Sequence, residues 1–230
     1  MRLAILITNT DRTPFALARP DDGEKFGELI NEAEPDWETV PFWAIDGQLP
    51  EEPFDGLIIT GSPASIHSGA PWIEPLKAYL TDQIEARTPI FAACFGHQLV
   101  AELLGGRVGK ADHWIHGRTV TKIAALPWAE AQSLSIYASN SEQVLEAPNG
   151  AEVIASSPDC PIAGIRTNRI LTTQFHPEMR PEFLADLVEE NAEALGESVT
   201  ERARASLSIE ADGKELARLI ADFFIWATKA

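Results

Sequence analysis

One cysteine stands at the end of an apolar run, where its thiol could act as a nucleophile. In PIFAACFGHQLVAELLGG (89–106), Cys94 closes the apolar part and a helical pattern begins directly after it, with the small residues Ala92 and Gly96 two positions to either side. A strand that turns sharply into a helix holds a nucleophile above the edge of a sheet. The start of that helix favours the thiolate and offers free N–H groups to an oxyanion. Taken alone, such a cysteine is more often a small core residue.

Two further segments carry the groups that such a nucleophile needs. In TTQFHPEM (172–179), His176 follows a predicted strand and Glu178 comes two residues later. A histidine with a nearby carboxylate supplies a general base and the group that orients it. In IITGSPASIH (58–67), a buried strand runs into a turn at Gly61, whose amides could complete an oxyanion hole at the same sheet edge. Each turn by itself is also typical of an ordinary strand end.

Buried strands and helices alternate through the first half of the chain and would position these groups. Strands are predicted at 3–8, 38–45, 56–61 and 89–94, and helices at 24–33, 70–86 and 96–105. Such alternation predicts parallel strands joined by right-handed crossovers. We therefore expect an α/β fold with a flavodoxin-like layered sheet, mostly parallel with added antiparallel strands, and helices on both faces.

In the second half of the chain, the alternation of strands and helices gives way to successive short strands. Short antiparallel strands are predicted at 117–124, 133–139, 151–157, 162–167 and 169–175, with a tight hairpin at 167–169. Helices follow at 180–195 and 215–230, and the polar stretch 196–214 between them is partly helical or loop. We expect one domain over 1–230, with 180–230 as a C-terminal helical segment packed on it.

Four motifs resemble those of one enzyme family, occur in that family's order and extend the resemblance over nearly the whole chain. CFGHQ, QFHPE, the GSP turn and GGRVGKADHWIHG (105–117) are similar to the elbow, the His-Pro-Glu motif, the oxyanion loop and the Trp-x-x-Gly stretch of class I, or triad-type, glutamine amidotransferases, such as the glutaminase domain of GMP synthetase. In two places the pattern differs. Ala92 replaces a glycine, and SNSEQV (139–144) has Asn140 and Glu142 where the family often has histidine and aspartate.

The resemblance implies a mechanism and a set of site residues. Cys94 would attack the side-chain amide of glutamine, form a γ-glutamyl thioester and release ammonia, while His176 moves the protons and Glu178 orients His176. The N–H groups of Gly61 and Phe95 would hold the oxyanion. The substrate-binding residues would be Ser62, Gln98, Ser139, Asn140 and Ser141.

The destination of the ammonia is open. A glutaminase could supply a separate synthetase subunit, or a stand-alone γ-glutamyl hydrolase or peptidase could act on a small γ-glutamyl compound. A non-catalytic binding or regulatory protein with the same fold is a third alternative, which the complete set of Cys94, His176 and Glu178 disfavours. We expect no cofactor and no metal, because His113 and His116, read as part of a loop, lack further ligands at known spacing.

Net charge and composition limit the classes of partner and the cellular setting that we expect for this chain. A formal net charge of −17 disfavours nucleic acids and anionic membrane surfaces. The start of the chain has no signal-peptide pattern, and no apolar run has the length of a membrane span. Two cysteines, Cys94 and Cys160, do not form a disulfide framework, so a reducing cytoplasm is the expected setting. Cys160 is expected to be a packed thiol, and His97 to point away from the nucleophile.

Overall fold

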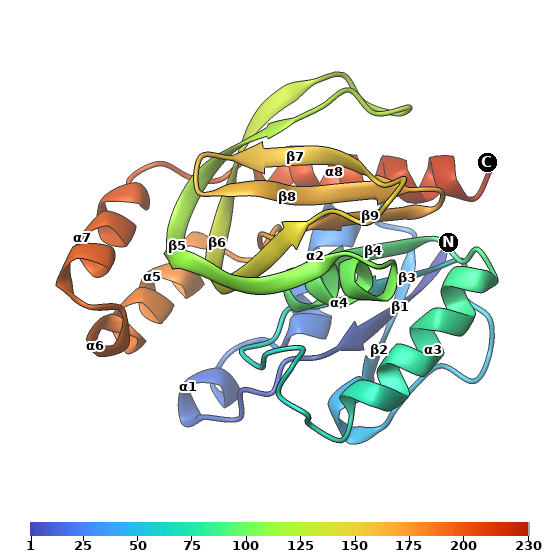
Figure 1. The fold of residues 1–230 in the computed structure, drawn as a ribbon, viewed down its shortest axis with the longest axis horizontal. Helices are drawn as coiled ribbons and strands as arrows, with labels where there is room; N and C mark the ends of the chain where they lie inside the picture. Colours follow the sequence, from blue (N-terminus) through green and yellow to red (C-terminus); the bar gives the residue numbers. More distant parts are fainter. Residues whose placement is uncertain (230) are drawn as a thin grey trace.

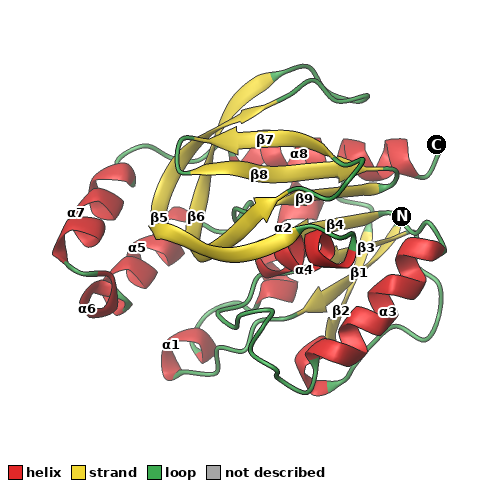
Figure 2. Cartoon of the chain, viewed as in Figure 1, coloured by secondary structure: helices red, strands yellow, loops and turns green. Residues whose placement is uncertain are grey.

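A computed structural model describes residues 1–229 of the chain. Nine strands form one sheet in the order β2-β1-β3-β4-β9-β8-β7-β5-β6. In chain order they are β1 (Arg2–Ile7), β2 (Glu38–Trp43), β3 (Gly56–Ile59), β4 (Ile90–Ala93), β5 (Arg107–Ile123), β6 (Gln132–Glu146), β7 (Glu152–Ser157), β8 (Cys160–Thr167) and β9 (Ile170–Thr173). This layered α/β architecture confirms the expected fold class (Figures 1 and 2).

Helices cover both faces of the sheet. They are α1 (Pro14–Leu17), α2 (Asp22–Ala33), the short 3₁₀ turn η1 (Ala44–Asp46), α3 (Ile73–Glu85), α4 (Phe95–Leu103), α5 (Pro181–Glu190), α6 (Ala192–Leu195), α7 (Glu197–Ser206) and α8 (Gly213–Ala227). Successive side chains of a strand point to opposite faces. Leu3 and Ile5 of β1 therefore join one core cluster with α2 and α8, whereas Ala4 and Leu6 join a second cluster with α3 and α4.

The parallel half of the sheet follows the apolar runs of the sequence. β1 pairs in parallel with β2 and β3, β3 with β4, and β4 with β9. Every residue of β3 and β4 is buried, as expected for strands covered on both faces. β2 is the edge strand, which tolerates Pro41 in its middle.

The antiparallel half differs from the prediction in two ways. The segment 169–175 was expected as an added antiparallel strand, but β9 is parallel to β4 and antiparallel to β8, so it joins the two halves. β5 and β6 have 17 and 15 residues, far longer than the predicted 117–124 and 133–139. The first part of β5 has no apolar run that would mark it as a strand, because exposed polar residues recur along it. Its pairing with β6 is also irregular, with a register shift between Lys110 and Ile115. The tight hairpin at 167–169 is present, with Asn168 at a φ of 43°.

The C-terminal helices also correct the predicted bounds. The segment expected as one helix over 180–195 is broken at Asn191 into α5 and α6, and α7 occupies part of 196–214. Figure 1 shows α5, α6 and α7 grouped at one end of the molecule beside β5. α8 packs on α2, and the last residue of the predicted 215–230 helix lies outside the described residues. Among the helices of residues 1–229, none has both the length and the apolar character of a membrane span.

Gly56 allows α8 to approach β3. A Cβ at this position would lie 2.5 Å from Cε1 of Phe224. We expect Gly56→Ala to lower the free energy of unfolding by about 1–3 kcal/mol, because the ring or the helix must move. Urea unfolding followed by circular dichroism measures this change. Gly213→Ala is the matched control, since a Cβ there meets no atom within 4 Å; an equal loss in both variants would contradict the steric explanation.

Candidate active site

The turn from β4 into α4 places Cys94 in a strained conformation. Its φ is 50° and its ψ is −106°, a combination that L residues rarely adopt. Gly96 permits the turn, because a Cβ there would lie 2.8 Å from the carbonyl oxygen of Ile59. Ala92 is fully buried in β4, opposite Ile59, so the elbow forms with a methyl group at the position where a glycine was expected.

His176 lies just beyond β9, beside Glu178. Its Nδ1 is 2.7 Å from Oε1 of Glu178, and both side chains are buried. The backbone N–H of His176 donates to the carbonyl of Tyr137 in β6, which fixes the histidine against the antiparallel half of the sheet. Burial lowers the pKa of His176, but the charges of Glu178 and Cys94, with hydrogen bonds to both, raise that pKa well above its ordinary value. The protonated form of His176 is therefore favoured.

Gly61 brings a backbone amide to the same point. A Cβ on Gly61 would lie 2.8 Å from Cε1 of His176 and 3.4 Å from Cβ of Cys94. The N–H groups of Gly61 and Phe95 donate no hydrogen bond to any residue of the described chain. The side chain of Cys94, a histidine paired with a carboxylate and two free amides thus lie together, which is the arrangement that acyl transfer requires.

A cavity of about 310 Å³ opens over this group. Of the sequence-predicted site residues, all except Phe95 line it: Gly61, Ser62, Cys94, Gln98, Ser139, Asn140, Ser141, His176 and Glu178. Phe95 is fully buried and stacks near Trp72, so it can offer only its backbone. The segment 139–144, which lies beyond the predicted strand 133–139 except for Ser139, is part of β6.

A comparison with known protein families adds the deciding observation. Residues 30–191, more than half of the chain, match the family described as glutamine amidotransferase class-I. This chain belongs to the class I glutamine amidotransferase family. The resemblance drawn from the four sequence motifs is thereby confirmed at the level of the family.

Two kinds of curated relative match this chain. A GMP synthase [glutamine-hydrolyzing] of Mycolicibacterium paratuberculosis is 30% identical over 183 residues, which are 72% of this chain and 33% of that protein. The match thus spans about a third of the synthase. Gamma-glutamyl peptidase 2 of Arabidopsis thaliana is 28% identical over 224 residues, covering 91% of this chain and 85% of the peptidase. A glutamine amidotransferase structure from Thermotoga maritima shares the fold, with a TM-score of 0.77 at 14% identity, over 100% of this chain and 99% of that one.

Gln98 joins the two sides of the cavity, and Asn140 hydrogen-bonds within β6 beside it. Nε2 of Gln98 in α4 donates to the carbonyl of Glu142 at 2.9 Å and to Oε1 of Gln174 at 3.3 Å. Nδ2 of Asn140 donates to the same carbonyl of Glu142 at 3.1 Å. Oδ1 of Asn140 is buried and has no partner among the described atoms, so it is free to accept a hydrogen bond from a ligand.

Reading the sequence missed two residues beside the nucleophile. Gln174 is fully buried and its Nε2 lies 3.8 Å from Sγ of Cys94; its place in QFHPE was the available signal. His116 lines the cavity with both ring nitrogens buried and unpartnered among the described residues. Burial, and then the charge of His176, lower the pKa of His116 to about 4, so its ring is neutral. His116 was considered only as a metal ligand in a loop, but it lies in β5, and residues 1–229 hold no group of three or more potential metal ligands.

An ion pair between buried Asp22 and half-buried Lys25 also borders the cavity, and the sequence gave no sign of this burial. Asp22 and Lys25 occupy the first turn of α2, and Nζ of Lys25 lies 3.0 Å from Oδ1 of Asp22. Asn9 donates from Nδ2 to Oδ2 of Asp22 at 3.1 Å. Burial raises the pKa of Asp22, Lys25 opposes that rise, and the charge of Glu178 adds to it. The capping box formed by Asp21 predicts only that a helix starts here.

His97 follows the nucleophile closely but has a packing role. Its ring is fully buried, and Nδ1 lies 2.6 Å from Oγ1 of Thr172 in β9. Burial lowers its pKa from 6.5 to about 4. The histidine therefore points away from Cys94, as the helical spacing predicted, and stays neutral inside the protein.

Acid should destabilise the protein through His97. Neutral His97 contributes its full stability above about pH 6.5, and this contribution is lost as the pH falls toward about 4, because the unfolded chain then binds a proton that the folded chain excludes. The loss from this residue should be about 3 kcal/mol. Denaturant unfolding at the two pH values should show a smaller fall for His97→Gln than for the wild type. Exposed His67 gives the control variant His67→Gln, and an unchanged fall in His97→Gln would contradict the assignment.

Proposed function

We propose that this chain hydrolyses γ-glutamyl amides, with glutamine as the simplest substrate. Cys94 is the nucleophile, His176 the acid and base, and Glu178 the group that orients His176. The observation that carries the proposal is the meeting of Cys94, strained at the elbow with a φ of 50°, and His176, whose Nδ1 is 2.7 Å from Glu178. Membership of the class I glutamine amidotransferase family supports the same chemistry.

The proposed reaction has two steps. In the first step the thiol proton of Cys94 passes to His176 and Sγ bonds to the carbonyl carbon of the side-chain amide, while the N–H groups of Gly61 and Phe95 hold the developing oxyanion. His176 gives its proton to the leaving nitrogen, the C–N bond breaks, and ammonia or an amine departs from a γ-glutamyl thioester. His176 then takes a proton from water, whose oxygen attacks the thioester; as the C–S bond breaks, His176 returns this proton to Sγ, and glutamate and the thiol are released.

The glutamyl part of the substrate would lie along β6. Oδ1 of Asn140, free of partners among the described atoms, can accept from the α-ammonium group. Backbone groups of Ser139 and Ser141, with Ser62 at the opposite turn, line the space for the carboxylate end. Gln98 supports this wall through the carbonyl of Glu142.

Two fates of the leaving group remain as candidates. A glutaminase subunit would pass ammonia to a separate synthetase, as the relationship to GMP synthase suggests. A γ-glutamyl hydrolase would act alone, and the match to gamma-glutamyl peptidase 2 along 85% of that protein favours this second candidate.

A substrate screen without any partner tests both. Purified protein is given glutamine and a set of γ-glutamyl peptides and amides, and released ammonia and glutamate are measured. Strong turnover without a partner protein supports the hydrolase. Turnover of glutamine only in the presence of a synthetase supports the amidotransferase. No turnover of any substrate, together with no labelling of Cys94 by an electrophilic glutamine analogue, would reject enzymatic function.

A further inference from the structure

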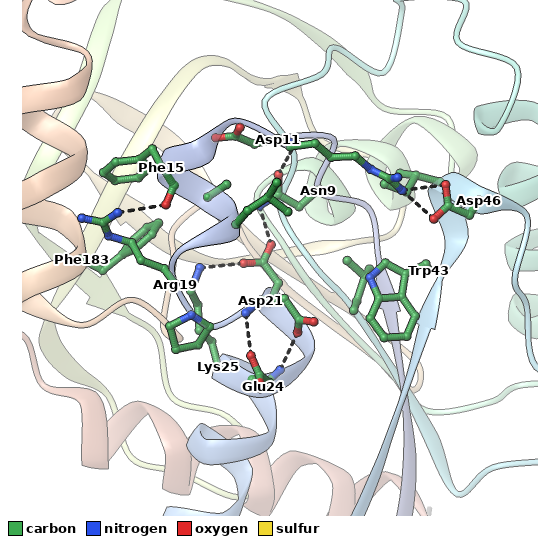
Figure 3. A pocket seen from close by; sticks show the side chains of 17 residues that line it. Asn9, Asp11, Phe15, Arg19, Asp21, Glu24, Lys25, Trp43, Asp46 and Phe183 are labelled. Atoms are coloured by element: carbon green, nitrogen blue, oxygen red, sulfur yellow. Dashed lines mark hydrogen bonds and ion pairs between the residues drawn. The ribbon is translucent and has the colours of Figure 1, made fainter.

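A second pocket adjoins the cavity over Cys94. This outer pocket has a volume of about 450 Å³, and its walls include Phe15 and Leu17 of the α1 segment, Trp43 of β2, and Phe183 of α5. Figure 3 shows Phe15 and Phe183 on one side of it and Trp43 on the other. Glutamine alone has no need of this space beyond the cavity of about 310 Å³.

The two spaces share a wall. Asn9, Asp11, Asp22, Lys25 and Phe183 line both the outer pocket and the cavity over Cys94. Asp22 is close enough to Glu178 and His176 for their charges to act on it. The outer pocket therefore adjoins the His176 side of the reacting centre. In the proposed reaction His176 protonates the leaving nitrogen, so the leaving group also lies on this side.

Part of the surface of the outer pocket is aromatic and aliphatic. The rings of Phe15 and Phe183 lie 6.0 Å apart, and the guanidinium of Arg19 stacks 3.9 Å from the centre of Phe15. Leu17 lies at the rim and is 73% exposed, more than any other large apolar side chain of residues 1–229. These groups offer contact to an apolar ligand that would cover them.

The charges of the outer pocket select against a carboxylate. Five carboxylates and three cations line it. Each cation already has an acidic partner: Arg12 with Asp46 at 2.6 Å, Arg19 with Asp186 at 2.6 Å, and Lys25 with Asp22 at 3.0 Å. A neutral or cationic group fits this surface, whereas an anionic group would meet a net negative charge.

We propose that the outer pocket binds the amine part of a γ-glutamyl amide whose leaving group is an aromatic or aliphatic amine without a carboxylate. This inference rests on the proposed function and names its substrate class. The bonds made and broken are those of the proposed reaction: the C–N bond of the amide breaks, His176 supplies the proton, and the free amine leaves through the outer pocket while water later releases glutamate.

Three substrates test this inference on the purified full chain: glutamine, γ-glutamyl phenethylamide and γ-glutamyl phenylalanine. The last two carry the same ring and differ by one carboxylate. We expect kcat/KM for the phenethylamide to exceed that for glutamine and for the phenylalanine compound by about tenfold or more, the effect of filling an apolar pocket and of avoiding a charge.

Variants that line only the outer pocket separate its contribution. Leu17→Ser and Phe15→Ala should each lower kcat/KM for the phenethylamide by about tenfold, while ammonia release from glutamine stays unchanged. Ile209→Ser is the matched control, because Ile209 is also exposed, at 58%, and does not line the outer pocket. Exposed Leu17 makes its variant safe for folding even if the Phe15 variant is unstable.

The outcomes distinguish the two levels of the proposal. Turnover of glutamine with no preference for the phenethylamide, or equal losses on both substrates in Leu17→Ser, would overturn the outer pocket as a binding site and leave the proposed function standing. No turnover of any of the three substrates would overturn both.

Discussion

Cys94→Ala is expected to lower the hydrolysis of every γ-glutamyl amide by at least about 10⁴-fold, the scale of loss when a covalent nucleophile is removed. Without Sγ no thioester can form, although the amides of Gly61 and Phe95 and the cavity remain. The measurement is the rate of ammonia or glutamate release at saturating substrate. Labelling of the protein by an electrophilic glutamine analogue should also disappear.

The second cysteine provides the control for this variant. Cys160 is buried, and burial raises the pKa of its thiol to about 12, so it stays protonated and unreactive. Cys160→Ala should therefore retain activity, and circular dichroism should show that both variants are folded. Residual activity above one part in about 10² in Cys94→Ala would contradict a covalent mechanism through this residue.

Glu178→Gln is expected to lower kcat/KM by about 10²–10⁴-fold, the range for loss of a group that orients and charges a catalytic histidine. The carboxylate is 2.7 Å from Nδ1 of His176 and raises its pKa, so the amide should return that pKa toward its ordinary value. The pH profile of kcat/KM should then shift, with the limb that reports His176 moving to lower pH.

Glu178→Gln should also change how the free energy of unfolding depends on pH. His176 has a folded pKa above its unfolded value, so its contribution is complete below about pH 6.5 and is lost as the pH rises through the folded pKa. Glu178→Gln should reduce this alkaline loss, measured by denaturant unfolding between neutral and alkaline pH. Glu189→Gln removes a surface carboxylate paired with Arg204 and is the control. An activity loss without any shift in the pH profile would contradict the orienting role.

The elbow was predictable from the sequence because its information is local. β3 and β4 are buried on both faces and show continuous apolar runs, and Gly96 marks the close approach to Ile59. The placement of His176 after β9 also followed from its motif. The strands that pair with β9 could not be predicted in the same way. An apolar pattern does not show whether β9 is parallel or antiparallel to its neighbours.

Other parts of the site depend on contacts between distant segments. The length of β5 is hidden by exposed polar residues, so His116 was not recognised as a cavity residue. Asp22 and Lys25 look like the charged start of a surface helix, and only the packing of α2 against the sheet buries them. Such burial is a property of tertiary structure, which local sequence patterns do not record.

The isolated β-bridge between His176 and Tyr137 makes the site depend on both halves of the sheet. Cys94 and Gly61 belong to the parallel half, whereas the backbone of His176 is fixed to β6 in the antiparallel half. The reactive pair exists only after β9 has joined both halves. A newly made chain therefore cannot pair Cys94 with His176 until residue 176 has been synthesised and β9 has docked between the two halves.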